Sequence, residues 1–141
     1  MIEIKETAYT SRKVKLLKEE MAEYFAKNLQ GNQYINKDLH IPILVNRSSL
    51  KHILNRGVVG FGKVALIKVL PELIAKSTFV TKGAPKDIQR DVNVSAYLNF
   101  RIDVRIFGVV REVNIVVRVY GKGKNEVENV YYHHSIKSLE Q

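Results

Sequence analysis

The sequence contains no cysteine, which excludes disulfides and thiolate metal ligands and leaves the redox compartment of the protein open. It also has no apolar run near the roughly 18 to 20 residues that a membrane-spanning helix needs. The N-terminus lacks the basic, apolar and small-residue segments of a secretory signal peptide. These absences predict a chain with no membrane-spanning segment and no signal peptide of its own.

Acidic residues are few relative to basic ones. The sequence has 14 Asp and Glu against 23 Lys and Arg, a formal net charge of +9. A surplus of this size attracts polyanions, namely nucleic acid, an anionic membrane surface or an acidic protein. The 141 residues suffice for one domain, and 45% hydrophobic and 26% charged residues are ordinary for a globular protein. Composition therefore predicts one small basic domain whose partner is nucleic acid or an acidic inhibitor.

The N-terminal part contains a segment with helical periodicity. Residues 12–30 place five apolar side chains on one helical face: Leu17, Met21, Tyr24, Phe25 and Leu29. Gly31 and Asn32 follow and are typical of a helix C-terminus. We expect residues 1–40 to form an N-terminal helical extension and residues 41–141 to form the main α+β domain, the two together being one compact unit.

The middle of the sequence contains several short elements. Pattern and capping residues predict an extended segment at 41–45, a short helix at 46–57, a helical stretch at 61–77, a strand at 79–83 and a loop at 82–94. Pro71 interrupts the second helical stretch. Because proline fits the first turn of a helix better than its interior, a new helical segment should begin there.

The last third of the sequence has the period of two that is typical of half-buried strands. The apolar residues of the first strand are Leu98, Phe100, Ile102, Val104 and Ile106. A second alternating strand follows at 111–120, and a third is predicted at about 127–135. The alternation predicts three strands that each bury one face.

A hairpin connects the first two of these strands. The dipeptide at 108–109, Gly-Val, fits the glycine-first form of a two-residue turn. Closing the hairpin there pairs residues whose numbers sum to 217, so Phe100 would lie opposite Val117. The third strand would pair with the second through residues whose numbers sum to 247, which places Tyr132 opposite Ile115. Both registers keep apolar residues together on one face.

Helices followed by an antiparallel meander predict an α+β fold, with N-terminal helices packed on one face of a sheet of about four strands. The apolar side of the sheet would meet the helices. The other side, called the open face below, would carry Tyr97, Asn99, Arg101, Asp103, Arg105, Asn114, Arg118 and Tyr120. Three arginines and two tyrosines there indicate either a solvated surface or a platform for a polyanion.

The segment "VYYHHSI", residues 130–136, contains two of the four histidines. In the expected register Tyr131 and His133 lie on the open face, whereas His134 shares the parity of the buried face near the strand end. A one-residue bulge would exchange the two histidines. His40, in a loop, is expected to be a surface residue. Adjacent strand histidines point to opposite faces, and the sequence has no His-x-x-His or Glu-x-x-His pattern, so no metal site is predicted.

Histidines, a cation and a basic surface suffice for metal-free cleavage of RNA through its 2′-hydroxyl. A base takes the 2′ proton, an acid protonates the leaving 5′ oxygen, and a cation stabilises charge on the phosphate. Histidine suits the proton steps because its pKa lies near neutrality. The candidate catalytic residues are His52, His133, His134, Arg101 and Arg118. The candidate RNA-binding residues are Lys51, Tyr97, Arg105, Tyr120 and Tyr131. The tyrosine rings among them would stack on splayed bases.

Three stretches carry a resemblance to a known group of proteins. They are "LVNRSSLKHILN", "LIKVLPELIAKS" and the final "VYYHHSI". In this order the chain resembles nuclease-like domains of the barnase/EndoU/colicin/RelE superfamily, and is most similar to those associated with large phage polyvalent proteins and polymorphic toxins. The likeness covers about residues 43–137. The matching positions are Ser49 with Lys51 and His52, Leu70 through Ile74, and Tyr132 with His134.

The resemblance implies a four-stranded antiparallel sheet behind N-terminal helices, with an active site on the exposed face and no cofactor. It implies a toxin domain that cleaves tRNA or another structured RNA in the cytoplasm. It also implies delivery within a larger secreted or injected protein, and an acidic immunity partner. The family pattern favours His134 as the catalytic residue, whereas the pairing register favours His133. His133 also departs from the asparagine or aspartate that is usual at its position, so both histidines remain candidates.

A second interpretation is a non-catalytic module in which the same fold binds RNA, DNA or an acidic protein. A third is a phage structural or packaging accessory whose charge serves only proximity to DNA. A histidine within reach of an arginine on a positive sheet face would favour cleavage. Histidines that are far apart or buried would favour the binding module.

Overall fold

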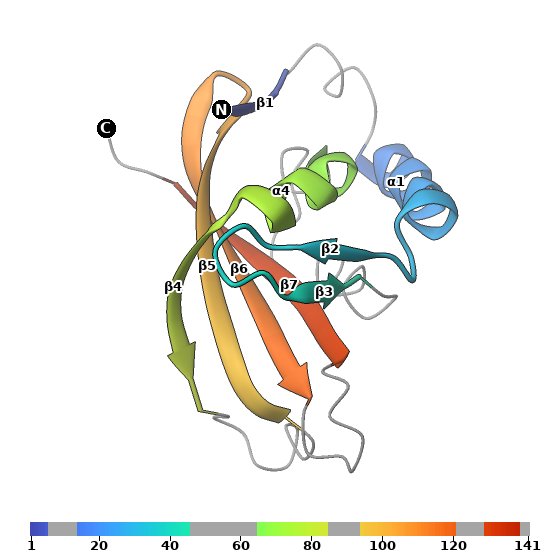
Figure 1. The fold of residues 1–141 in the computed structure, drawn as a ribbon. Coiled ribbons are helices and arrows are strands. Elements are labelled where there is room, and N and C mark those ends of the chain that lie inside the picture. Colours follow the sequence, from blue (N-terminus) through green and yellow to red (C-terminus); the bar gives the residue numbers. More distant parts are fainter. Residues whose placement is uncertain (6–13, 46–64, 85–93, 121–128, 139–141) are drawn as a thin grey trace.

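Five strands form one curved sheet, and the helices cover one of its faces (Figure 1). β4 (Thr78–Gly83), β5 (Val94–Ile106), β6 (Val109–Tyr120) and β7 (Asn129–Ser138) follow one another as an antiparallel meander. β1 (Ile2–Ile4) pairs in parallel with the end of β5. Because β5 is long, β4 and β1 share its outer side. The predicted α+β class is confirmed, with a strand ahead of the helices for which the sequence pattern gave no signal.

The structure is a computed structural model that describes residues 1–5, 14–45, 65–84, 94–120 and 129–138. Two predicted elements therefore lie wholly or mostly outside the described residues, namely the helix at 46–57 and the loop at 82–94.

α1 (Val14–Asn28) is the helix that the spacing of its apolar residues predicts. Leu17, Met21 and Phe25 are fully buried and lie on one helical face, while the opposite face is exposed and charged. The helix ends at Asn28, slightly before the predicted end at residue 30, and the turn that follows it contains Gly31. Its φ of +84° is a left-handed conformation, which glycine adopts without the penalty that a Cβ brings.

The second predicted helical stretch is divided at Pro71. A short 3₁₀ helix (Leu66–Val69) leads into α4 (Leu70–Lys76). Pro71 lies in the first turn of α4, where its missing N–H is not required by the helix. The prediction that a new helical segment begins at this proline is confirmed.

β2 (Gln33–Ile35) and β3 (Pro42–Leu44) form a two-stranded sheet on the same side of the main sheet as the helices (Figure 1). The sequence predicts β3 as an extended segment and gives no signal for β2. Asn36, fully buried in the β2–β3 connection, attaches this connection to α4. Its Nδ2 donates to the main-chain oxygens of Ile74 at 2.9 Å and Ser77 at 3.0 Å.

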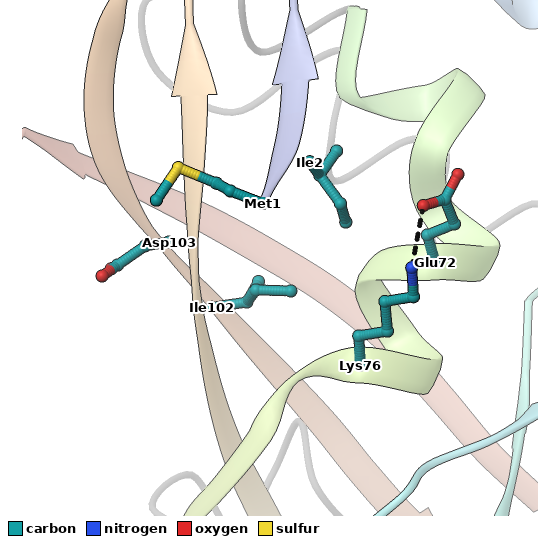
Figure 2. A pocket seen from close by; sticks show the side chains of 6 residues that line it. All are labelled: Met1, Ile2, Glu72, Lys76, Ile102 and Asp103. Carbon is teal, nitrogen blue, oxygen red and sulfur yellow. Dashed lines mark hydrogen bonds and ion pairs between the residues drawn. The ribbon is translucent and has the colours of Figure 1, made fainter.

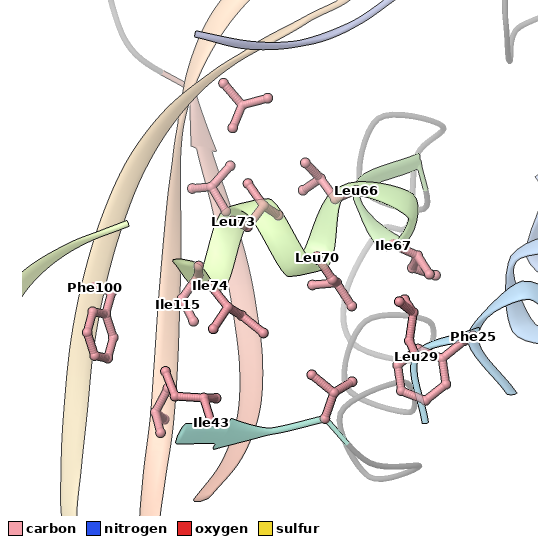
Figure 3. Close-up of a cluster of buried hydrophobic side chains, with 14 of the residues drawn as sticks. Phe25, Leu29, Ile43, Leu66, Ile67, Leu70, Leu73, Ile74, Phe100 and Ile115 are labelled. Carbon is pink, nitrogen blue, oxygen red and sulfur yellow. The ribbon is translucent and has the colours of Figure 1, made fainter. Parts of the chain in front are cut away.

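The hydrophobic core lies between the helices and the covered face of the sheet (Figure 3). Leu73 and Ile74 of α4 lie toward the sheet, where Phe100 of β5 and Ile115 of β6 are buried. Phe25 of α1 belongs to the same cluster of buried residues. The covered face therefore belongs to the interior, and the open face is the side of the sheet that these helices leave uncovered.

The register of the β5–β6 hairpin differs from the predicted one by two residues. Phe100 lies opposite Ile115 instead of Val117, so paired residue numbers sum to 215 and not 217. The cause is the turn, whose central residues are Phe107 and Gly108 with φ of +52° and +80°, as a type I′ turn requires. Because phenylalanine rarely adopts a positive φ, the sequence pattern predicts the turn one residue later, at Gly108-Val109. A shift of two residues leaves every side chain on its predicted face.

The predicted register of β6 and β7 is wrong by the same amount. Tyr132 lies opposite Val117 instead of Ile115, and paired numbers sum to 249 rather than 247. Because the shift is again an even number of residues, the assignment of positions to the two faces does not change.

Candidate nucleic-acid interface

The open face is organised in rows that cross β5, β6 and β7. One row consists of Tyr97, Arg118 and Tyr131, and the adjacent row consists of Asn99, Val116 and His133. Directly opposed residues share a face of the sheet, with Cβ atoms about 4.5–5.5 Å apart. The register therefore brings Arg118, two tyrosine positions and the position of His133 into one region.

Arg118 lies over the ring of Tyr97. The guanidinium carbon is 6.0 Å from the ring centroid, which is at the outer limit of a cation–π contact. Both residues are half-buried. The contact holds the guanidinium group against β5.

Arg118 has no acidic partner among the residues that the structure describes. Its Nε atom is buried and makes no hydrogen bond there. The Nδ2 atom of Asn114, four residues earlier on the same face of β6, is also buried without an acceptor. Buried donors without acceptors are uncommon in folded proteins and cost roughly 1–3 kcal/mol each. β6 thus carries two donors whose capacity the described part of the chain does not use.

The other two arginines of the open face do have acceptors. Nη1 of Arg101 lies 3.7 Å from Oε2 of Glu112, and the arginine side chain is 56% exposed. Nη1 of Arg105, which is also exposed, donates to the main-chain oxygen of Gly108 at 3.5 Å. Asp103 lies directly opposite Glu112. The acidic residues of β5 and β6 on the open face thus lie toward the hairpin turn, and Arg118 lies toward the other end.

The register separates the two adjacent histidines. His133 lies opposite Val116, in the row next to Arg118, whereas His134 lies opposite Ile115, a buried core residue. The pairing of β6 with β7 continues through this region without a bulge. Since successive strand residues alternate between faces, the backbone puts position 133 on the open side of the sheet.

The remaining candidates are not brought to this region by the described structure. His52 and Lys51 lie outside the described residues. Tyr120 lies at the end of β6 and does not pair with Tyr97, its predicted partner, because of the two-residue difference in register. His40 is exposed in the β2–β3 connection.

A model of one protein family matches most of the chain. Residues 12–132 match large polyvalent protein-associated domain 3. The chain belongs to this family. The association with large phage polyvalent proteins that the sequence resemblance indicates is thereby confirmed, and it fits a domain of a larger protein. No curated protein and no solved structure matches the chain.

Among the hollows that described residues line on this polyvalent protein-associated domain, two lie away from Arg118 and Tyr97. Figure 2 shows a cleft of about 340 Å³ between β1, α4 and β5, in which Glu72 and Lys76 of α4 pair with each other at 3.4 Å. A second hollow of about 500 Å³ is lined by Leu39, Ile41, Phe79, Lys82, Ala96, Leu98 and Val119. Neither is lined by Arg118 or Tyr97, so neither of these two hollows belongs to the open-face site.

Within the described ranges of the domain, no three His, Asp or Glu residues gather in an arrangement that could hold a metal ion. None of its described helices is both long enough and apolar enough to cross a membrane.

The sequence of the domain predicts that Asn114 lies on the open face, but it does not indicate that this residue belongs to the candidate site. Alternation puts it on the open face, but no sequence signal shows that its Nδ2 atom lacks an acceptor among the residues that the structure describes. Whether a polar group is satisfied depends on the neighbours that the register brings to it, and the register needed the turn geometry.

Proposed function

We propose that this domain is a metal-independent endoribonuclease that cleaves RNA through its 2′-hydroxyl on the open face of the main sheet. The observation that supports it most is the half-buried Arg118, which has no acidic partner in the described part of the chain and lies one row from position 133. A cation near a histidine position suits a phosphodiester that is held during proton transfer. The net charge of +9 adds attraction for RNA.

The reaction needs a base, an acid and a cation at the phosphate. The base removes the proton of the 2′-hydroxyl, the 2′ oxygen bonds to phosphorus, and the bond from phosphorus to the 5′ oxygen breaks. The acid protonates that 5′ oxygen, which leaves a 2′,3′-cyclic phosphate and a 5′-hydroxyl end. His133 is the proposed proton-transfer group on the open face, and His52 is the proposed second group. Arg118 and Arg101 would stabilise the charge on the phosphate oxygens.

The proposed RNA contacts are Lys51, Tyr97, Arg105, Tyr120 and Tyr131, and the proposed substrate is tRNA or another structured RNA. The resemblance to the barnase/EndoU/colicin/RelE superfamily supports this reading. It also supports a toxin that acts in the cytoplasm after delivery within a larger protein, with an acidic immunity partner.

A non-catalytic module that binds nucleic acid or protein is the second candidate. It is favoured by the register, which assigns His133 and His134 to opposite faces of the sheet. The two adjacent histidines therefore do not meet at one phosphate, and a two-histidine mechanism depends on His52.

The deciding experiment incubates the purified domain with total RNA in EDTA and resolves the products on a denaturing gel. The wild type is expected to give discrete fragments with 2′,3′-cyclic phosphate ends. His133→Ala should abolish them, and His52→Ala should reduce them strongly. His40→Asn is the matched control, because His40 is exposed and asparagine tolerates its φ of +53°.

His134→Ala decides between the adjacent histidines, provided that its melting temperature is compared with that of the wild type. Loss of cleavage in a fully folded His134→Ala, with cleavage retained in His133→Ala, would reverse the assignment. Intact RNA in every reaction, with folded protein, would exclude the ribonuclease and leave the binding module.

A further inference from the structure

Arg118 differs from the other arginines of the open face in what compensates its charge. Arg101 is paired with Glu112, and Arg105 donates to the main chain of the hairpin turn. Arg118 is half-buried, is held by the ring of Tyr97 and has no carboxylate partner in the described part of the structure. An added anion would therefore stabilise Arg118 more than it would stabilise the other arginines of this surface.

Because Arg118 is half-buried, an added anion stabilises it more than it would stabilise an exposed lysine or arginine. A charge loses hydration when it is buried, and the loss is recovered only if a counter-charge or hydrogen-bond acceptors replace the water. The forked donors of a guanidinium fit two oxygens of a phosphate, and such charge-assisted bonds are stronger than neutral ones. The site is thus suited to one phosphate group.

The position of Arg118 restricts the form of the nucleic acid. β6 has β5 on one side and β7 on the other, so Arg118 lies on an inner strand and not on an edge strand. The residues opposite it in both neighbouring strands are tyrosines, Tyr97 and Tyr131. Aromatic residues beside a phosphate site suit bases that are unstacked, and duplex bases are stacked inside the helix.

We infer that Arg118 binds a backbone phosphate of single-stranded RNA, and that Tyr97 positions its guanidinium group for this contact. The strand lies across the row formed by positions 97, 118 and 131, with an unpaired base beside the phosphate. The substrate class of the proposed ribonuclease is then an unpaired segment of a structured RNA, such as a loop. The inference rests on the proposed function only in placing RNA on the open face.

The test measures binding without cleavage. The probe is a fluorescent 2′-O-methyl RNA of about 12 nucleotides, a length within the range that single-strand-binding folds cover. The methyl group blocks attack by the 2′ oxygen, so the probe stays intact whether or not the domain is a nuclease. Fluorescence anisotropy gives the Kd for the single strand and for its duplex with a complementary 2′-O-methyl strand.

The wild type is expected to bind the single strand at least roughly tenfold more tightly than the duplex. Arg118→Leu should weaken single-strand binding roughly tenfold and reduce the slope of log Kd against log salt by about one. Arg101→Leu should have a smaller effect, because the charge of Arg101 is already compensated by Glu112 and is therefore less available to a phosphate. Lys27→Gln on α1 removes the same charge from an exposed pair with Glu23 and should leave the Kd unchanged.

Tyr97 is tested by rescue, because a change at this residue can also act on stability. Tyr97→Leu should weaken binding several-fold, and Tyr97→Phe should restore it, since the ring and not the hydroxyl faces the guanidinium. Arg118→Lys keeps the charge but not the planar fork, so it should bind more weakly than the wild type and more tightly than Arg118→Leu.

Three outcomes would overturn the inference. They are equal affinity for single strand and duplex, equal losses in Arg118→Leu and Lys27→Gln, and no binding of either probe by folded wild type. The last result would leave an acidic protein as the partner. Arg118-dependent binding of the single strand together with intact RNA in the cleavage assay would reject the ribonuclease and keep the inference.

Discussion

Asn36 and Ser77 are joined inside the protein, although β3, the 3₁₀ helix and α4 lie between them along the chain. Nδ2 of Asn36 donates to the main-chain oxygen of Ser77 at 3.0 Å and to its Oγ at 3.3 Å. Oδ1 of Asn36 accepts from the main-chain N–H groups of Asp38 at 2.9 Å and Leu39 at 3.2 Å. Both Asn36 and Ser77 are buried. One amide therefore shapes the β2–β3 connection and attaches it to the end of α4.

Asn36→Ala should lower the free energy of unfolding by about 2–4 kcal/mol, because it leaves buried carbonyl and N–H groups without partners. Urea denaturation of the wild type and the variant measures the difference. The control is Asn32→Ala, which removes a 2.7 Å hydrogen bond to the main-chain oxygen of Asn28 in exposed surroundings. It should cost less than about 1 kcal/mol. Equal losses of unfolding free energy in the two variants would show that the buried hydrogen bonds of Asn36 add no stability beyond that of an exposed one.

The glycines allow the effect of backbone conformation to be separated from the effect of space. A Cβ added at Gly108, Gly31 or Gly83 would meet no atom within 4 Å. Gly108 and Gly31 have φ of +80° and +84°, whereas Gly83 has no positive φ. Alanine at the first two positions should therefore cost about 1–2 kcal/mol each, from the left-handed backbone alone.

Gly83→Ala is the matched control for that comparison and should be neutral or slightly stabilising, because alanine restricts the unfolded chain. Thermal unfolding monitored by circular dichroism ranks the three variants. A Gly83→Ala variant as unstable as Gly108→Ala would contradict the role assigned to the turn.

The hairpin register can be tested by cross-linking, since the chain has no cysteine of its own. Asn99 and Val116 lie directly opposite each other, whereas a register with sums of 217 would place Asn99 opposite Arg118. Opposed Cα atoms are about 4.5–5.5 Å apart and can be bridged by a disulfide, but diagonal neighbours at about 7–8 Å cannot. Asn99→Cys/Val116→Cys should therefore oxidise to a disulfide in the folded protein.

Asn99→Cys/Arg118→Cys is the comparison and should stay reduced under the same mild oxidation. Mass spectrometry of protein digested without reductant detects the cross-linked peptide. A disulfide in the second variant and none in the first would restore the register that the turn dipeptide predicts.

The sequence predicts which face of the sheet each strand residue occupies, but it does not predict the register of the strands. The alternation of residues 98–106 assigns each side chain to a face, because side chains in a strand have a period of two. It does not distinguish registers that differ by two residues, since both bury the same set. That choice depends on the turn, where Phe107 adopts a φ of +52° that its residue type disfavours. Phe107 also packs against the core, and only the tertiary structure reveals that contact.

Elements with a local signal were predicted, and elements that depend on distant partners were not. α1 has an apolar face with helical spacing, and Pro71 marks the start of α4. β1 and β2 are three residues each, and their pairing with β5 and β3 supplies what the local sequence lacks. For the candidate site, the open-face residues follow from alternation. That the Nε atom of Arg118 finds no acceptor among the described residues follows from tertiary geometry alone.

If Arg118, which has no acidic partner in the described ranges, is a phosphate site, a carboxylate placed beside it should compete with RNA. Asn99 is the diagonal neighbour of Arg118 across β5 and β6, because Tyr97 lies directly opposite it. Asn99→Asp should weaken binding of the 2′-O-methyl single strand several-fold and leave the melting temperature unchanged or higher, since the new charge compensates a half-buried cation. The same anisotropy assay and a thermal melt measure both effects.

Gln33→Glu is the control for Asn99→Asp because it changes the net charge equally at an exposed position of β2. It should reduce binding only through long-range electrostatics, which salt near physiological strength screens within about 8–10 Å. Weaker binding with retained stability in Asn99→Asp but not in Gln33→Glu would tie the effect to Arg118. Equal weakening in both variants would mean that the +9 charge as a whole, and no single residue of the open face, attracts RNA.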